Sequence, residues 1–403
     1  MKTTSNNSTA PSLPEVRAAI DALDSKLLGL LAERQRLAEL VIKAKHSEGS
    51  TTTIRDEARE RDLIRQRIAE ARPLGLEAHF VTKVFHELIG ESIRLQQDFL
   101  QRRLNGTPTG PAVRIAFQGI DGSYSHIAGK GFFNASAARS GRSAPAGESF
   151  VGFASYAGAV QAVESGACDF GVLPIDTTTS GAINDVYDLL LNSNVSIVGE
   201  EKFLVNYCVV GTSTVPLSHL TRIYCTPVSM SECSEFLSSL PECSVEFSTD
   251  AALAAKRLKD DNEPLHAAIA SEEAAEMFGL SVLKRGVGNH ESSFTRYLII
   301  AKTPVKVDSR IPAKTSIVIN TLNRPGALVE ALSVFPQHGI NLSKLESRPI
   351  PSNHWEEMFY IDFLGNLESA EVVRALAELG SHVQSIKVLG CYPACDIDPI
   401  SEV

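Results

Sequence analysis

A long helical pattern at the front of the chain most constrains what it can fold into. Apolar residues recur there at steps of three and four, with no proline between Val16 and about His46. They are Val16, Ile20, Leu23, Leu27, Leu30, Leu31, Leu37 and Val41. The pattern predicts a helix of about thirty residues, or ~45 Å at 1.5 Å per residue. Because so long a helix cannot bury its stripe within its own chain, we expect a homodimer or higher homo-oligomer with interlocked helices.

Two further helices are predicted behind the first. One runs from about Asp56 to Ala71 and ends before Pro73, and the other runs from about Leu76 to Leu104. Residues 13–104 are therefore expected to form an all-α domain. The polar residues 1–12 are expected to be a disordered tail, and the Pro- and Gly-containing residues 105–111 a linker.

The rest of the chain predicts two domains that mix helices and strands. With 403 residues the chain is too long for one core. Alternating strand and helix patterns over residues 112–302 predict an α/β domain. After a connector at 303–314, residues 315–392 predict a βαββαβ domain of the α+β class, followed by a tail at 393–403. Its expected strands are 315–320, 341–347, 357–364 and 383–389, and its expected helices are 327–335 and 369–379.

Composition limits the classes of partner and cofactor. No run of eighteen apolar residues is present, so no membrane partner is expected. Residues 13–104 are close to neutral, so the net charge of −10 lies in residues 105–403. No nucleic-acid partner is expected. The seven cysteines form no Cys-x-x-Cys pair, which favours free thiols in a reducing cytoplasm over a metal site. Neither a metal nor a cofactor is predicted.

Polar residues follow the helical front domain in a specific order. The segments are Val16-Arg17, Leu23 to Leu28, Leu31 to Arg34, Lys43 to Lys45, Arg55 to Glu60, Glu91-Ser92 and Gln96. This order resembles the helical type of chorismate mutase. The reaction implied by the resemblance is the pericyclic rearrangement of chorismate to prephenate, which requires a compact dicarboxylate and a stabilised ether oxygen rather than an acid or nucleophile.

The resemblance implies a role for each of these polar residues. Arg34 and the other chain's Arg17 would hold the carboxylates with Ser92, while Lys45 and Gln96 would donate to the ether oxygen. Glu60 and Asp56 would hold the ring hydroxyl, and Arg59 would orient them.

Three motifs of the middle domain occur together. They are Leu173 to Gly181, Ile183 to Leu190, and Phe294-Thr295-Arg296-Tyr297. They resemble those of prephenate dehydratases, whose two lobes are built like periplasmic binding proteins and close on substrate. The resemblance implies one lobe from 112–195 with 285–301 and another from 200–284. It also implies that Thr295 bonds to the reacting ring, that Arg296 binds a carboxylate and that Ser180 donates a hydroxyl.

Some polar positions of the middle domain depart from that family. Asp176-Thr177 replaces the family's Glu-Asn, and Glu232 replaces a glutamine, so two amide side chains are absent. An ionised carboxylate only accepts hydrogen bonds, whereas an amide also donates. The intact Thr295-Arg296 pair favours decarboxylation with dehydration to phenylpyruvate. Two alternatives stay open: a decarboxylase of secondary metabolism that leaves the ring non-aromatic, and a non-catalytic sensing domain beside an active mutase.

The last domain carries two motifs of an effector site. Arg324 to Val329 begins a predicted helix, and Leu345 to Pro349 lies on the next strand. Both resemble the ACT regulatory domain of phenylalanine-inhibited enzymes. The resemblance implies an amino-acid effector such as phenylalanine, bound by Gly326, Ala327, Leu328, Val329, Glu346, Ser347, Arg348 and Pro349. From about residue 14 to 393 the chain thus resembles the bifunctional chorismate mutase–prephenate dehydratase family of phenylalanine biosynthesis.

Overall fold

The computed structural model describes residues 12–47, 53–106, 113–139, 149–290, 292–349 and 357–395. Most of the predicted tails and of the predicted linker lies outside these residues. The chain divides into two compact units, one built from the chain up to Phe99 and one from Leu100 to Asp398. Among the described helices, none is long and apolar enough to cross a membrane.

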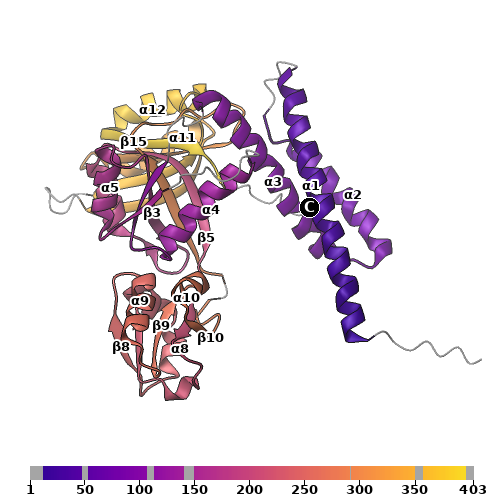
Figure 1. Cartoon of the computed structure of the whole chain (residues 1–403). Helices are drawn as coiled ribbons and strands as arrows, with labels where there is room; N and C mark the ends of the chain where they lie inside the picture. Colours follow the sequence, from indigo (N-terminus) through magenta and orange to yellow (C-terminus); the bar gives the residue numbers. More distant parts are fainter. Residues whose placement is uncertain are drawn as a thin grey trace, which may run out of the picture. The chain divides into compact units, whose positions relative to one another are not determined.

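Three helices account for the first unit. They are α1 (Leu13–Ser47), α2 (Glu57–Ala71) and α3 (Ala78–Asn105), the last residues of which belong to the second unit (Figure 1). Asp56 caps α2 by accepting a hydrogen bond from the backbone N–H of Arg59 at 3.0 Å. A short 3-10 turn, η1 (Arg72–Leu74), ends at Gly75, whose φ of 77° favours glycine. The three predicted helices are confirmed, with small differences at their ends.

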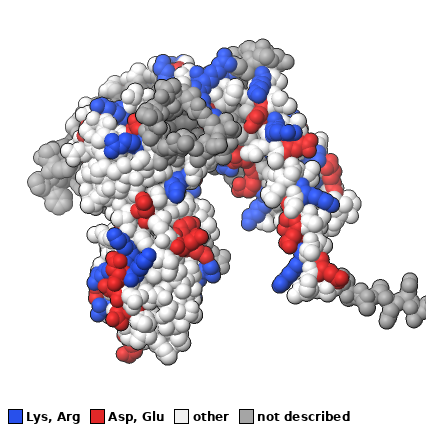
Figure 2. Space-filling view, viewed as in Figure 1, with Lys and Arg blue, Asp and Glu red and all other residues white. Residues whose placement is uncertain are grey.

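The apolar stripe of α1 is exposed in the described chain. Leu23, Leu27 and Leu30 keep 62%, 54% and 63% of their surface accessible. Charged side chains of both signs are interspersed with uncharged surface over these helices (Figure 2). An extended row of exposed leucines marks a surface for another protein chain more often than a solvated face.

The first lobe of the second unit is a six-stranded sheet. Its strand order is β2-β1-β3-β11-β5, and β4 pairs with β3. The strands are β1 (Arg114–Gln118), β2 (Ser149–Phe153), β3 (Phe170–Thr177), β4 (Gly181–Ala182), β5 (Ser196–Leu204) and β11 (Phe294–Ala301). The helices are α4 (Tyr124–Arg139), α5 (Tyr156–Glu164) and α6 (Asn184–Asn192). The parallel strands β1, β2 and β3 confirm the α/β class, and β11 runs antiparallel between β3 and β5.

The second lobe is a five-stranded sheet inserted between β5 and β11. Its strand order is β10-β6-β9-β7-β8. The strands are β6 (Cys208–Gly211), β7 (Arg222–Cys225), β8 (Ser244–Phe247), β9 (His266–Ala270) and β10 (Ser281–Lys284). The helices are η2 (Leu217–His219), α7 (Pro227–Glu232), α8 (Ser234–Ser238), α9 (Ala251–Asp261) and α10 (Glu272–Phe278). The predicted second lobe began near residue 200, but β5 continues in the first sheet to Leu204.

The C-terminal domain is a four-stranded antiparallel sheet in the order β13-β14-β12-β15. Its elements are β12 (Ala313–Thr321), α11 (Ala327–Gln337), β13 (Asn341–Pro349), β14 (Glu357–Leu364), α12 (Ala370–His382) and β15 (Val383–Pro393). This confirms the predicted βαββαβ order. The first strand starts at Ala313, two residues inside the predicted connector.

Both faces of this last sheet are covered. One face packs against α11 and α12 through a core that includes Phe335, Phe363 and Leu379. The other face shares a core with the first lobe, in which Val318 and Tyr360 join Ile300. Gly390 of β15 approaches β5 so closely that a Cβ there would overlap the carbonyl of Ile197. The C-terminal domain is therefore packed directly onto the lobe that carries β11.

Candidate functional site

A cavity of about 390 Å³ lies among the three helices of the first unit. Its polar lining consists of Arg34, Thr53, Asp56, Arg59, Glu60, Ser92 and Gln96, and its apolar lining of Leu37, Ala38, Val41, Ile54, Leu63, Ile89 and Ile93. A concave site of this size, with a few polar groups on apolar walls, is typical of small-molecule binding.

Hydrogen bonds fix the polar groups of this cavity. Arg34 Nη1 donates to the carbonyl of Leu88 and to Ser92 Oγ, both at 2.8 Å. Gln96 lies one turn beyond Ser92 on α3, and its Nε2 donates to the Ser92 carbonyl at 3.1 Å. Burial lowers the pKa of Arg34. Burial raises the pKa of Glu60, although Arg55 donates to its carboxylate at 3.3 Å.

Six of the eight residues predicted for the mutase site line this cavity. The two others are Arg17 and Lys45. Arg17 is exposed on α1, about 25 Å along the helix from Arg34 at 1.5 Å per residue, and so cannot reach the same cavity within one chain. Lys45 lies in α1, but its side chain is outside the described part of the chain. Leu37 and Val41 of the predicted α1 stripe also line the cavity, whereas its apolar lining from outside α1 was not predicted.

A partly buried cluster of hydroxyl groups surrounds the buried Glu232 where the two lobes meet. Ser180 Oγ donates to Glu232 Oε1 at 2.8 Å, and Thr179 Oγ1 donates to the same oxygen at 2.5 Å. Ser293 Oγ donates to Oε2 at 2.9 Å. Glu232 closes α7 in the second lobe, while its donors precede β4 and β11 of the first lobe. An acceptor with two oxygens suits this position, because all three neighbours donate.

Two predicted threonines lie beside this cluster. Thr295 is buried on β11, and its register partner on β3 is Thr177. The Thr177 hydroxyl accepts the backbone N–H of Ser180 at 2.7 Å, which shapes the turn that carries the cluster. The structure thus gathers Thr177, Ser180, Glu232 and Thr295 in one region. Thr179 and Ser293 were missed, although the run of hydroxyl residues at 177–180 is a signal for them.

Arg296 and Asp176 lie elsewhere than the sequence led us to expect. The Arg296 guanidinium donates to Glu200 at 2.8 Å, to Asp362 at 2.6 Å and to Tyr392 at 2.9 Å. Asp176 pairs with Lys344 at 3.1 Å and, more weakly, with Arg296 at 3.6 Å. Since every nitrogen of Arg296 has a protein partner, this structure does not support its predicted role as a ligand of the substrate carboxylate.

One acidic residue at the lobe junction was not predicted. Asp250 caps α9 of the second lobe by accepting from the N–H of Leu253 at 3.0 Å. Its carboxylate abuts Gly119 of the first lobe, where a Cβ would come within 2.8 Å of Asp250 Oδ2. Burial raises the pKa of Asp250 to about 6. This carboxyl therefore changes charge close to neutral pH in contact with both lobes.

A second cavity, of about 370 Å³, opens at the start of α11 in the C-terminal domain. Its lining includes the predicted effector residues Gly326, Ala327, Leu328 and Val329, together with Asn320, Thr321, Leu322, Asn323, Arg324, Glu357 and Phe359. Gly326 adopts a φ of 85° and begins the helix. Free N–H groups at a helix start suit a carboxylate.

The second half of the predicted effector site does not line this cavity. Glu346, Ser347, Arg348 and Pro349 lie on β13. Arg348 instead pairs with Asp188 of α6 at 2.7 Å, and the Glu346 carboxylate lies 3.9 Å from Lys344 Nζ. The two motifs are therefore not joined in one pocket of a single chain.

Comparison with known families assigns each region a class. Residues 16–97 match chorismate mutase type II, residues 115–305 match prephenate dehydratase, and residues 315–381 match the ACT domain. The chain is 42% identical over 387 residues to the bifunctional chorismate mutase/prephenate dehydratase of Escherichia coli (strain K12). That alignment covers 96% of this chain and 97% of the relative. The chain belongs to the family of bifunctional chorismate mutase/prephenate dehydratases.

Solved structures share the fold of the second unit. Prephenate dehydratase from Arthrobacter aurescens in complex with L-Phe is 25% identical, with a TM-score of 0.63, and the match covers 72% of this chain and 92% of that one. GqqA, described as a novel type of quorum quenching acylase, is 28% identical with a TM-score of 0.60, covering 70% of this chain and 98% of that one. The fold of the second unit is therefore found in proteins described by different activities, and the site residues have to discriminate between them.

Proposed function

We propose that this protein rearranges chorismate to prephenate in its helical unit and converts prephenate to phenylpyruvate in its bilobed domain, under feedback control by an amino acid such as phenylalanine. The observation that carries the proposal is the helical cavity, which gathers two arginines, two acids, two hydroxyls and an amide from three helices and the segment before α2. These groups serve a reaction that depends on holding and charge stabilisation alone.

The first reaction follows from the charges in the cavity. Arg34, already braced by Ser92 and the Leu88 carbonyl, would hold a substrate carboxylate in a fixed direction. Gln96 would donate to the ether oxygen as negative charge develops there. Glu60 would accept the hydrogen bond of the ring hydroxyl. Because no proton is transferred, every group acts through its position.

A second chain would complete this cavity. The exposed leucines of α1 and the distance between Arg17 and Arg34 support a dimer in which each chain supplies Arg17 to its partner's cavity. The same association would cover the apolar stripe.

The second reaction requires a donor near the leaving hydroxyl. Loss of carbon dioxide pushes electrons through the ring, and water departs once the hydroxyl is protonated. Thr295 and the hydroxyl cluster around Glu232 are the described groups suited to bond at the ring. Since every nitrogen of Arg296 already has a protein partner, the carboxylates of prephenate would be held by other donors in the cleft between the lobes.

One observation favours a second candidate reaction. Thr177 and Glu232 stand where the family pattern has amides, and the Glu232 carboxylate accepts three hydroxyl donors. A cleft changed in this way would suit decarboxylation with retention of the ring hydroxyl. A silent sensing domain beside an active mutase is the third candidate.

A single assay separates these proposals. The purified full chain is given chorismate, and the products are followed by ultraviolet absorbance and mass spectrometry. Phenylpyruvate supports the proposed function. A non-aromatic keto acid that retains the hydroxyl supports the second candidate, and accumulation of prephenate supports the sensing domain. Absence of any chorismate turnover would refute the proposed mutase.

Regulation is tested in the same assay by adding phenylalanine. The solved relative in complex with L-Phe supports phenylalanine as the effector. Inhibition of prephenate consumption is expected, whereas an unchanged rate over a wide range of phenylalanine concentration would contradict the regulatory proposal.

A further inference from the structure

The ends of β3 and β11 carry different chemistry on their two faces. Thr177 is the register partner of Thr295, and Asp176 is the register partner of Arg296. Successive residues of a strand point to opposite faces of a sheet. The two threonines therefore share one face, and the acid–base pair lies directly behind them. A register shift follows Arg296, and irregularities of this kind re-aim side chains next to functional sites.

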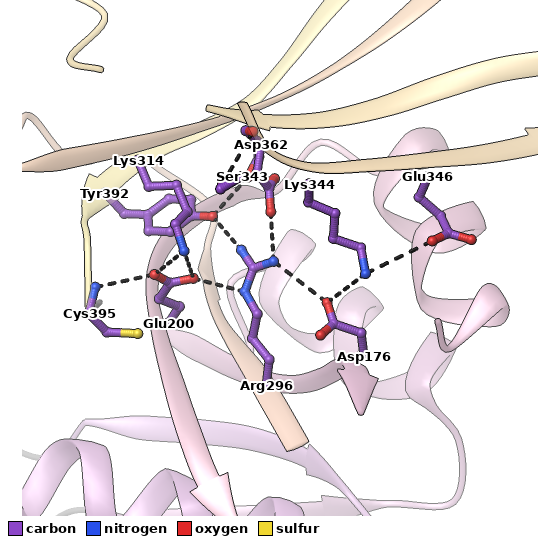
Figure 3. A network of polar contacts seen from close by, with 11 residues as sticks. Asp176, Glu200, Arg296, Lys314, Ser343, Lys344, Glu346, Asp362, Tyr392 and Cys395 are labelled. Carbon is purple, nitrogen blue, oxygen red and sulfur yellow. Dashed lines mark hydrogen bonds and ion pairs between the residues drawn. The ribbon is translucent and has the colours of Figure 1, made fainter. Parts of the chain in front are cut away.

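The acid–base pair is held by the ACT domain. Asp362 of β14 and Tyr392 of β15 accept from Arg296, and Lys344 of β13 pairs with Asp176 (Figure 3). Glu200 of β5 completes the set, because its carboxylate accepts from Arg296 at 2.8 Å and from Lys314 of β12 at 2.7 Å. Strands of both domains thus converge on one guanidinium.

This charge cluster is buried at its centre. Four acids, Asp176, Glu200, Glu346 and Asp362, face three bases, Arg296, Lys314 and Lys344. The side chains of Glu200 and Lys314 are 0% and 3% exposed. A charge buried to this extent requires its partner, so removal of one member changes the position of the others.

The ACT domain also donates hydrogen bonds to α6, the helix that follows the turn carrying Ser180. The Tyr360 hydroxyl donates to the Tyr187 carbonyl at 2.6 Å. Lys387 Nζ donates to the carbonyls of Leu190 and Ser193 at 3.1 and 2.8 Å, at the end of α6. Both elements that flank the hydroxyl cluster are therefore fixed from the same side.

One strand connects these contacts with the effector cavity. Glu357 and Phe359 of β14 line the cavity at α11. Tyr360 and Asp362, on the alternate face of the same strand, contact α6 and Arg296. A ligand that moves the cavity wall therefore moves a strand whose other face holds the back of β11.

We propose that Arg296 is a positioning residue through which the ACT domain sets the geometry of Thr295, with Asp362 on β14 as the contact that transmits effector binding. The proposal rests on the proposed prephenate-consuming function of this same site. The ACT domain accordingly forms a structural part of the lyase site in addition to its regulatory role.

The test compares Asp362→Asn with the wild-type full chain. The amide still fills the space but gives up the charge that pairs with Arg296. Prephenate kcat is expected to fall roughly 10- to 100-fold, the range for a displaced catalytic group, while KM changes less. The rate from chorismate to prephenate should not change, and phenylalanine should no longer inhibit the remaining prephenate turnover.

Two further variants control for folding and charge. Glu378→Gln neutralises another acid of the ACT domain and should behave as wild type. Glu378 lies on the side of the domain away from the first lobe and pairs with His338 at a distance of 2.8 Å. Lys344→Met removes the partner of Asp176 and should lower kcat in the same direction but by less. If Asp362→Asn matches Glu378→Gln in kcat and in phenylalanine inhibition, the proposal is wrong.

Hydrogen exchange separates this inference from the proposed function. Phenylalanine should change the amide protection of residues 294–297 in the wild type and leave it unchanged in Asp362→Asn. A wild-type protein that shows this response but leaves prephenate intact would refute the proposed function and keep the coupling. If the wild type shows no such response, or the variant responds equally, the coupling is refuted whatever the activity.

Discussion

The helical cavity and the hydroxyl cluster between the lobes contain similar polar side chains, but the elements that position those side chains differ. In the first unit, Ser92 and Gln96 lie one turn apart on α3, and the packing of α1 against α3 brings Arg34 beside them. In the second unit, Glu232 meets Ser180 and Ser293 only because two lobes close on each other. A site built on regular helices can be anticipated residue by residue, whereas a site at a junction depends on which side chains the surrounding domains engage.

The largest expected effect tests whether the two sites are independent. Replacing Arg34 with alanine removes the central cation of the helical cavity and should lower mutase kcat/KM roughly 10²- to 10³-fold. Prephenate supplied directly should be consumed at the wild-type rate. Arg36→Ala, on the exposed side of the same helix, is the matched control and should keep both activities. Equal loss of both reactions in Arg34→Ala would contradict separate sites.

The next largest effect is expected when association with the partner chain is prevented. Of the two sites, only the helical cavity is expected to require a residue of that chain. Leu27→Lys combined with Leu30→Lys places two charges on the exposed stripe of α1 and should prevent association. Mutase activity should fall by roughly tenfold or more, because Arg17 no longer completes the cavity. Light scattering measures the mass, and both activities are assayed in the same sample.

Leu74→Lys is the control for that experiment, since Leu74 is equally an exposed leucine but lies on η1. It should leave mass and activity unchanged. A double α1 variant that keeps the wild-type mass and mutase rate would rule out the proposed dimer surface.

A third prediction tests the hydroxyl cluster between the lobes by substituting Glu232. Glu232→Ala leaves three hydroxyl donors without their acceptor, at a cost of roughly 1–3 kcal/mol, so prephenate kcat/KM should fall about 10- to 100-fold. Glu232→Gln keeps one acceptor oxygen and should lose less. Glu235→Ala, an exposed neighbour on α8, should have no effect. Mutase activity is the internal reference, and an unchanged kcat/KM in Glu232→Ala would remove the cluster from the site.

The smallest effect is one of stability against pH. The pKa of Asp250 is raised from an ordinary value of 3.8 to about 6, so the folded state holds this proton more tightly than the unfolded state. The resulting stabilisation is complete below about pH 4 and is lost as pH rises through 6, amounting to roughly 2–3 kcal/mol. Asp250→Asn, which still caps α9, should flatten this decline.

Thermal unfolding measured between pH 4 and pH 8 checks this last prediction. Relative to wild type, the variant should gain stability at pH 8 more than at pH 4. A parallel shift at all pH values would show that Asp250 does not titrate in this range.

Much of the architecture followed from periodicity. The three helices of the front unit and the βαββαβ order were predicted because helical stripes, prolines and turn residues are local signals. The extent of β5 was not, because its last residues pair with β11, ninety residues away along the chain, and nothing local marks that pairing.

The site residues likewise divide into those that the sequence could predict and those that depend on contacts between distant segments. The family resemblance grouped six residues that the structure brings to one cavity, while their catalytic roles stay predictions. The role of Arg296 as a carboxylate ligand stays a prediction. Its contacts could not be predicted, because a motif names a residue but not the side to which it turns, and its partners Asp362 and Tyr392 come from another domain. Asp250 was missed because its acidity depends on burial beside Gly119, which no spacing reveals.

The glycine at position 390 carries a consequence for how such enzymes diversify. Backbone of β15 lies against backbone of β5 with no room for even a methyl group at this point. A regulatory domain taken from another protein and joined after residue 312 would need a glycine at the equivalent position as well as the same fold. Exchange of sensors among these enzymes is therefore restricted at the seam, and new effector preferences are more readily gained by altering the pocket wall than by recombining whole modules.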